Sequence, residues 1–318
     1  MAGDERIVVL AGGVGASRFL QGLVQVVGDP AAITVISNTG DDLEFLGLRV
    51  SPDVDIVIYA LAGAVNPETG WGLAGDTFHV VEALQRYGYE RWFNLGDRDL
   101  ATALHRTRLL REGQPLHAAV ADIAQAWGVR CRILPMCDER VETRIVTPEG
   151  ELPFQEYMVR RATEPEVSGV RFAGIERARP APGVLEAIAA ADVLVFAPSN
   201  PFVSIGPILA VPGIRAAIER TAARRAAVSP IIAGQAVKGP AAKMLAALGH
   251  EVSALGVARL YRGLVDVMVI DEADRVLAPR IEALGMRCVA VPTLMTDDAA
   301  KAALARATLE AASQVRRG

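Results

Sequence analysis

The chain has 318 residues, of which 51% are hydrophobic and 22% charged. This composition excludes an intrinsically disordered protein, because it offers enough apolar surface for a core. The net charge of −4 excludes nucleic acid as the main partner, since binding a phosphate backbone requires clustered cations. No run approaches the roughly 20 consecutive apolar residues of a membrane-spanning helix, and Asp4 and Glu5 stand where a signal peptide would be basic. We therefore expect a cytoplasmic protein without nucleic-acid or membrane partners.

Short β-branched runs alternate with alanine-rich helical segments along most of the chain. Strands are expected at residues 6–10, 33–37, 91–95, 193–196, 227–232, 267–270 and 288–291. Continuous apolar strands between helices are typical of a parallel sheet that is covered on both faces. The sequence thus predicts an α/β fold with a doubly wound, mainly parallel sheet.

Three segments depart from this alternation. Residues 97–130 read as helices without strands, which predicts a small inserted helical subdomain within a single domain over residues 1–318. Residues 142–160 contain two alternating runs around Pro148-Glu149-Gly150, a turn that predicts a β-hairpin. Four arginines between residues 215 and 225 predict the solvated face of a helix, and residues 299–312 predict a closing helix.

The first predicted strand leads into a glycine-rich turn. Gly12, Gly13 and Gly15 precede a helical segment, and backbone N–H groups in such a turn can approach a phosphate at the positive end of the helix. The spacing matches neither the dinucleotide fingerprint nor a Walker loop. A phosphate cradle is favoured over a tight strand–helix turn without a ligand.

Acidic residues cluster after the second predicted strand. Asn38 is followed by Asp41 and Asp42, and then by Asp53 and Asp55. Parallel sheets bind ligands at the carboxyl ends of their strands, so these side chains could bind a substrate beside the glycine turn. Mg²⁺ commonly takes one or two carboxylates together with substrate phosphates. Aspartates in turns are more often helix caps, but together with the glycine turn they favour a Mg²⁺ site.

Two further motifs carry polar groups at loop positions. Asp97-Arg98-Asp99 could hold a charged substrate through the arginine, or it could be a helix N-cap beside a solvent-facing arginine. Ser199-Asn200 lies between two prolines and is followed by Ser204; this rigid turn could display hydroxyl and amide groups to a base or phosphate.

In this order, the motifs resemble the 2-phospho-L-lactate transferase family of coenzyme F420 biosynthesis. The resemblance rests on Gly12–Gly15, Asn38–Asp42, Ser51–Asp55, Leu95–Thr102, Phe154–Tyr157, Ala197–Pro201, Ser204–Ile208 and Thr293–Asp297. It implies a Rossmann-like α/β core, a Mg²⁺ requirement and a homodimer. The implied reaction joins the deazaflavin alcohol Fo to a phospho-acid, either 2-phospholactate or phosphoenolpyruvate, that is activated as a guanosine diphosphate ester, and GMP leaves.

Roles for the residues follow from the implied reaction. The glycine turn, Ser199 and Asn200 would hold the guanosine diphosphate portion, while Asp41, Asp53 and Asp55 would hold Mg²⁺.

One of these three aspartates, with Asp41 and Asp53 favoured, could in addition orient or deprotonate the Fo hydroxyl. Arg98 would position the acid or the deazaflavin, together with Asp97 or Asp99. Ala103 and Cys137 stand where the family commonly has histidine and serine.

Two alternatives belong to other functional classes. A related family of gluconeogenesis-factor-like proteins shares the glycine turn and the Asn-Pro turn, but its members are non-catalytic regulators that bind a uridine diphospho-sugar. An NAD-dependent dehydrogenase would need an acidic residue at the end of the second strand, where this chain has Asn38. The motifs around residues 96–99 and 154–156 favour the transferase over the regulator, and Asn38 makes the dehydrogenase the weaker alternative.

Overall fold

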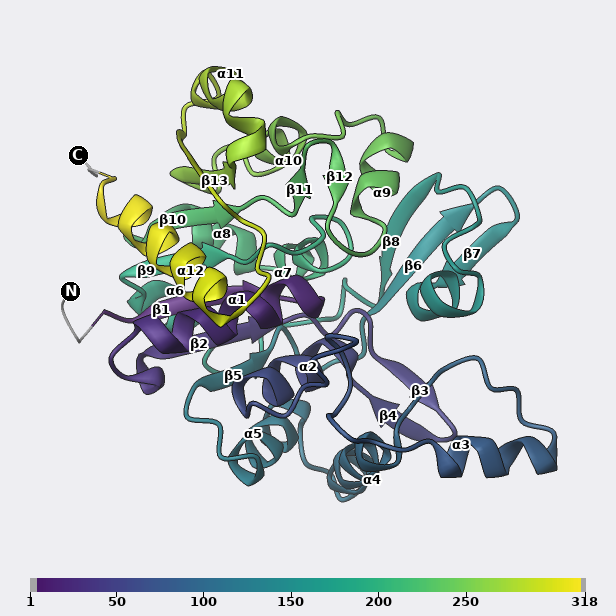
Figure 1. The fold of residues 1–318 in the computed structure, drawn as a ribbon. Helices are drawn as coiled ribbons and strands as arrows, with labels where there is room; N and C mark the ends of the chain where they lie inside the picture. The colour runs from purple at the N-terminus through teal and green to yellow at the C-terminus, as the bar shows by residue number, and fades with distance from the viewer. Residues whose placement is uncertain (1–4, 316–318) are drawn as a thin grey trace.

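A computed structural model of the chain describes residues 5–315. Its centre is a parallel sheet of seven strands (Figure 1). In spatial order these are β14 (Arg287–Val291), β13 (Val267–Asp271), β10 (Arg224–Val228), β9 (Val193–Phe196), β1 (Ile7–Ala11), β2 (Ile33–Ser37) and β5 (Arg132–Pro135). From β1 the chain builds outward through β2 to β5, and from β9 it builds the other way to β14. The order therefore reverses between β1 and β9, as in a Rossmann-like fold, and the predicted α/β fold class is confirmed.

Alternating side chains of the strands pack into two separate hydrophobic cores, one on each face of the sheet. In β1, Ile7, Val9 and Ala11 face one side of the sheet, whereas Val8 and Leu10 face the other. Strands that are buried on both faces need apolar residues at every position, which is why these segments read as continuous apolar runs.

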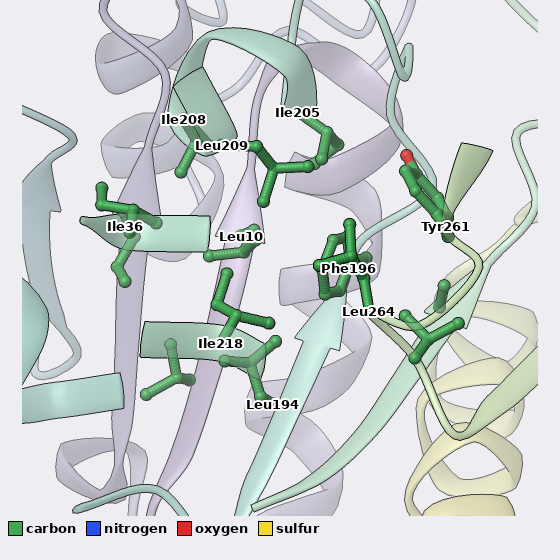
Figure 2. Close-up of a cluster of buried hydrophobic side chains, with 14 of the residues drawn as sticks. Leu10, Ile36, Leu194, Phe196, Ile205, Ile208, Leu209, Ile218, Tyr261 and Leu264 are labelled. Carbon is green, nitrogen blue, oxygen red and sulfur yellow. The ribbon is translucent and has the colours of Figure 1, made fainter. Parts of the chain in front are cut away.

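Helices cover both faces of the sheet. The side of Val9 packs against α1 (Gly13–Val26), α2 (Pro52–Leu61), α5 (Leu116–Ala126) and α12 (Asp298–Ser313). The side of Leu10 packs against α6 (Val184–Ala190), α7 (Ile205–Ala210), α8 (Ile214–Arg220), α9 (Ala241–Ala247), α10 (Ala254–Leu260) and α11 (Ala278–Glu282). Figure 2 shows this second core, where Leu10 and Phe196 lie among Ile205, Leu209 and Ile218.

Three small sheets lie outside the central sheet. An antiparallel three-stranded sheet has the order β7 (Gly150–Pro153), β6 (Glu142–Thr147), β8 (Gly169–Ala173), and two hairpins pair β3 (Leu43–Phe45) with β4 (Leu48–Val50) and β11 (Ile231–Ile232) with β12 (Gln235–Ala236). The predicted hairpin around Gly150 is thereby confirmed.

The remaining helical segments are mostly short. They are α3 (His79–Leu84), α4 (Asp97–Arg111), the 3₁₀ helices η1 (Pro30–Ala32), η2 (Gln85–Tyr87) and η4 (Glu272–Leu277), and the π-helix η3 (Glu156–Arg160). None of the helices in residues 5–315 combines the length and apolar character needed to cross a membrane.

Three predictions of local structure were wrong. Residues 91–95 form no strand, because Trp92 and Phe93 pack with Phe45 of β3, at ring-centroid distances of 6.0 and 5.5 Å. The strand predicted at residues 227–232 ends at Val228, just before Pro230, which lacks the N–H group a strand pairing needs. Arg224 and Arg225 lie in β10 and not on a helix, and Arg225 forms an ion pair with Asp266.

Candidate functional site

A cleft of about 420 Å³ opens at the carboxyl edge of the central sheet. Its walls come from the segments that follow β1, β2, β9, β10 and β14, so it lies across the point where the strand order reverses. Open α/β sheets bind their ligands at this position, because the crossover loops diverge there and leave a crevice. The cleft is the candidate active site.

The glycine turn forms the floor of the cleft by close contact. A Cβ atom on Gly12 would lie 2.6 Å from Asp53 Oδ2 and 2.8 Å from the Cβ atom of Ser204. A Cβ atom on Gly15 would overlap the carbonyl oxygen of Pro198. Both positions therefore require glycine, since the β1–α1 turn is pressed against α2 and against the loop after β9.

Two carboxylates from separate segments meet in the cleft. Asp41 follows β2, and Asp53 lies in the first turn of α2, where its Oδ2 accepts a 2.8 Å hydrogen bond from Asn38 Nδ2. Burial raises the pKa of Asp53 to about 6. Burial and the neighbouring charge of Asp53 raise the pKa of Asp41 well above its ordinary value. The pair therefore carries an electrostatic cost that a bound cation would remove.

The donor set fits a hard divalent cation. Oδ1 of Asp41 is buried and accepts no hydrogen bond from the described residues, which leaves one of its carboxylate oxygens without a partner in the cleft that Asp53 also lines. Residues 5–315 contain no group of three or more His, Cys, Asp or Glu side chains arranged to hold a metal. Two carboxylates are nevertheless a sufficient protein contribution for Mg²⁺, which takes its other ligands from water and substrate phosphates.

The structure turns the other two acidic residues of the cluster away from this pair. Asp42 accepts hydrogen bonds from Arg49 Nε at 3.2 Å and from Ser51 Oγ at 2.7 Å. Asp55 is bound by both terminal amino groups of Arg106. Neither residue lines the cleft, so the four predicted carboxylates divide into a cleft pair and two partners of buried or half-buried arginines.

The predicted Ser199-Asn200 turn also lies at the cleft, together with Ser204. Ser199 Oγ donates to the carbonyl of Gly12 at 2.9 Å and ties this turn to the glycine turn. Asn200 Oδ1 accepts the N–H of Phe202 at 2.9 Å, so its amide stabilises its own loop. Ser199 thus joins two loops of the cleft, and Asn200 stabilises one of them.

Asp97, Arg98 and Asp99 do not line the cleft. They lie at the start of α4 and hold the preceding loop. Asp97 accepts the N–H groups of His79 and Val80, both at 3.0 Å. Nη1 of Arg98 donates to the carbonyl of Ala74 at 2.9 Å. The side chains of this motif are thus occupied in holding residues 74–80.

Asp99 is the third member of that motif. Its Oδ1 accepts the Tyr59 hydroxyl at 2.7 Å. Burial, followed by the charge of Asp55, raises its pKa to about 7. A protonated carboxyl group therefore lies between α4 and α2 at slightly acidic pH.

Several cleft residues carried no predicted role. Arg18 and Lys238 supply two positive charges, and Phe154, Met158 and Leu294 form part of an apolar wall. Arg18 closely follows the glycine turn, and Phe154 lies in one of the family motifs, so the sequence could have indicated both as residues of the site. Lys238 had none, because nothing local links a lysine after β12 to a turn more than two hundred residues earlier.

The fold resembles that of a solved structure of a UPF0052-family protein from Bacillus halodurans. The two share a TM-score of 0.63 over 97% of this chain and 100% of that chain, at 18% sequence identity. At this identity the likeness concerns the fold alone.

Relatives with named activities are much more similar in sequence. A phosphoenolpyruvate transferase of Streptomyces griseus is 51% identical over 317 residues, which cover 98% of this chain and 99% of the relative. A 2-phospho-L-lactate transferase of Methanothermobacter thermautotrophicus is 45% identical over 303 residues, with 95% and 97% coverage. The family model of the 2-phospho-L-lactate transferase CofD matches residues 7–300. The chain is therefore a transferase and belongs to the 2-phospho-L-lactate transferase family.

Proposed function

We propose that this enzyme transfers a phospho-acid from its guanosine diphosphate ester to the alcohol Fo, forming a coenzyme F420 precursor and releasing GMP. The observation that supports this reaction most directly is the pairing of Asp41 with Asp53 beside the glycine turn, at the reversal of strand order. A diphosphate lying along the glycine turn would meet these carboxylates.

The proposed transfer requires one bond to form, one bond to break and one proton to be accepted by a residue of the cleft. The Fo hydroxyl oxygen forms a bond to the phosphorus that carries the acid, the bond from that phosphorus to the bridging oxygen breaks, and GMP leaves with the bridging oxygen. The hydroxyl proton passes to Asp41 or Asp53. Asp41 and Asp53 are the carboxylates that line the cleft, so either is placed to accept it.

Mg²⁺ is the proposed cofactor, with Asp41 and Asp53 as its ligands, and when bound it would neutralise charge on the diphosphate. Asp55, which the sequence also suggested as a ligand, is left out of this set because Arg106 occupies its carboxylate. Asn38 holds Asp53 in place through its 2.8 Å hydrogen bond.

The apolar wall of the cleft supports an aromatic acceptor. Phe154 and Met158 come from the segment after β7, and Leu294 comes from the loop after β14. A planar deazaflavin ring would bury apolar surface against them.

Phosphoenolpyruvate is the proposed acid, because the Streptomyces relative at 51% identity is named for it. We also propose that the enzyme works in the cytoplasm as a homodimer; light scattering on the purified protein tests the dimer.

The transfer is tested by incubating the protein with Fo, Mg²⁺ and either guanosine ester, followed by mass spectrometry of the deazaflavin. We expect a mass gain that corresponds to the phospho-acid, together with an equal amount of GMP. No mass gain with either ester, combined with tight binding of a uridine diphospho-sugar, would instead identify a regulator of the gluconeogenesis-factor type.

A further inference from the structure

Two cations that line the cleft, Lys238 and Arg18, are bound to backbone carbonyls. Lys238 Nζ donates to the carbonyl of Thr69 at 2.8 Å, and Arg18 Nη1 reaches the carbonyl of Met295 at 3.5 Å. Neither forms an ion pair within residues 5–315, although most other arginines of the chain do. Their positive charges therefore have no direct ion-pair partner among residues 5–315.

Arg18 and Lys238 lie 220 residues apart in the sequence but contact the same turn. Lys238 binds the carbonyl of Thr69, and a Cβ atom on Gly70 would lie 3.1 Å from Arg18 Nη2. The turn at residues 69–70 thus lies against both side chains and fixes where they enter the cleft.

The two cations also repel each other. Burial lowers the pKa of Lys238, and the positive charge of Arg18 lowers it further. Like charges that are held together without an anion raise the free energy of the folded protein. An anionic ligand would remove this cost, just as a cation would at Asp41 and Asp53.

We propose that Arg18 and Lys238 bind the phosphate groups of the donor substrate. This assignment rests on the proposed function for the identity of the donor, but its physical basis is the pair of unpaired cations beside the glycine turn. Guanidinium and ammonium groups are both strong phosphate partners, and the arginine can donate two parallel hydrogen bonds.

The cleft thus has a positively charged pair and a negatively charged pair. Arg18 and Lys238 attract the diphosphate directly, whereas Asp41 and Asp53 reach it through the proposed Mg²⁺. Lys238 would exchange the Thr69 carbonyl for a phosphate oxygen when the donor binds. Because both charged pairs act on the diphosphate, replacing Arg18 or Lys238 should lower the affinity for GDP more than the affinity for GMP.

The test is calorimetric titration of GDP, GMP and inorganic pyrophosphate, each with Mg²⁺, into the wild-type protein and its variants. Arg18→Gln and Lys238→Gln should each lower GDP affinity about tenfold, the effect of one lost charge-assisted hydrogen bond. GMP affinity should fall by a smaller factor, and Arg18→Lys and Lys238→Arg should recover part of the loss. Lys243→Gln is the matched control, since Lys243 also donates to backbone carbonyls but lies outside the cleft.

Two results would overturn the assignment. One is GDP affinity unchanged within about twofold in both glutamine variants. The other is an equal loss for GDP and GMP that the conservative variants do not restore, which would mean that the residues only shape the loop.

Pyrophosphate separates this proposal from the proposed function. If the wild-type protein binds pyrophosphate through Arg18 and Lys238 but shows no preference for guanosine nucleotides, the cation pair is upheld and the donor is wrong. If the wild-type protein binds neither GDP nor pyrophosphate, the cation pair is refuted.

Discussion

Arg106 on α4 and Asp55 on α2 form a buried bidentate ion pair, with Arg106 Nη1 donating to Asp55 Oδ2 at 3.1 Å and Nη2 binding Oδ1. Arg106 has no exposed surface. Asp55 lies two residues after Asp53 in the first turn of α2, and successive helical residues are turned by about 100°. The ion pair therefore fixes the helix end whose other side presents Asp53 to the cleft.

Removal of Arg106 should leave the carboxylate of Asp55 buried without an ion-pair partner. We expect Arg106→Met to lower the free energy of unfolding by about 3–5 kcal/mol, as measured by urea titration. The double variant Arg106→Met/Asp55→Leu should be more stable than Arg106→Met, because it leaves no unpaired charge. A double variant that loses the sum of both single losses would contradict this account.

Asp53→Asn should separate activity from stability. The substitution keeps the side-chain shape but removes one of two adjacent buried carboxylates, so turnover should fall about 100-fold or more while the free energy of unfolding at pH 7 stays the same or rises. Rates of deazaflavin product formation and urea unfolding measure the two effects. Asp122→Asn is the matched control, since Asp122 is exposed on α5. Turnover near the wild-type rate would remove Asp53 from the metal site.

Metal binding should stabilise the folded protein through Asp41 and Asp53. Added at about 100 times its dissociation constant in the presence of GDP, Mg²⁺ should contribute about 2.7 kcal/mol to folding and raise the melting temperature. Asp41→Asn should abolish most of this rise while folding normally. A melting temperature that responds to Mg²⁺ equally in both proteins would place the ion elsewhere.

Gly15→Ala should damage the floor of the cleft, because the added Cβ would overlap the Pro198 carbonyl oxygen. We expect a loss of about 1–3 kcal/mol in the free energy of unfolding, together with weaker GDP binding as the two loops are pushed apart. Gly28→Ala is the control: its added Cβ meets no atom within 4 Å. Equal stability of the two variants would show that the loops can separate without cost.

Asp99 should make stability depend on pH. Its pKa is about 7 in the folded protein, against about 3.9 in an unfolded chain. Between these values the folded state binds more protons, so the stabilising contribution is complete below pH 4 and is lost as the pH rises through 7. Asp99→Asn should therefore gain stability relative to wild type between pH 5 and pH 8, as measured by urea unfolding at several pH values. A difference that does not change with pH would mean that Asp99 titrates normally.

Much of the fold follows from local pattern. The strands of the central sheet read as continuous apolar runs because both faces are buried, and Pro148-Glu149-Gly150 marked the hairpin. Residues 91–95 show the limit: the segment was predicted as a strand of the central sheet, but Phe93 packs instead against Phe45 of the β3–β4 hairpin.

The sequence by itself determined the α/β class, the glycine turn and the acidic cluster from which the cleft pair is drawn. Tertiary structure alone decided which carboxylates face the cleft. Asp53 and Asp55 are chemically equivalent and two residues apart, yet one meets Asp41 and the other meets Arg106. It also decided that Lys238 meets the turn at residues 69–70 beside Arg18. The reason is physical: short-range pattern sets periodicity and turns, whereas the direction of a charged side chain depends on a partner that only the packed chain brings near.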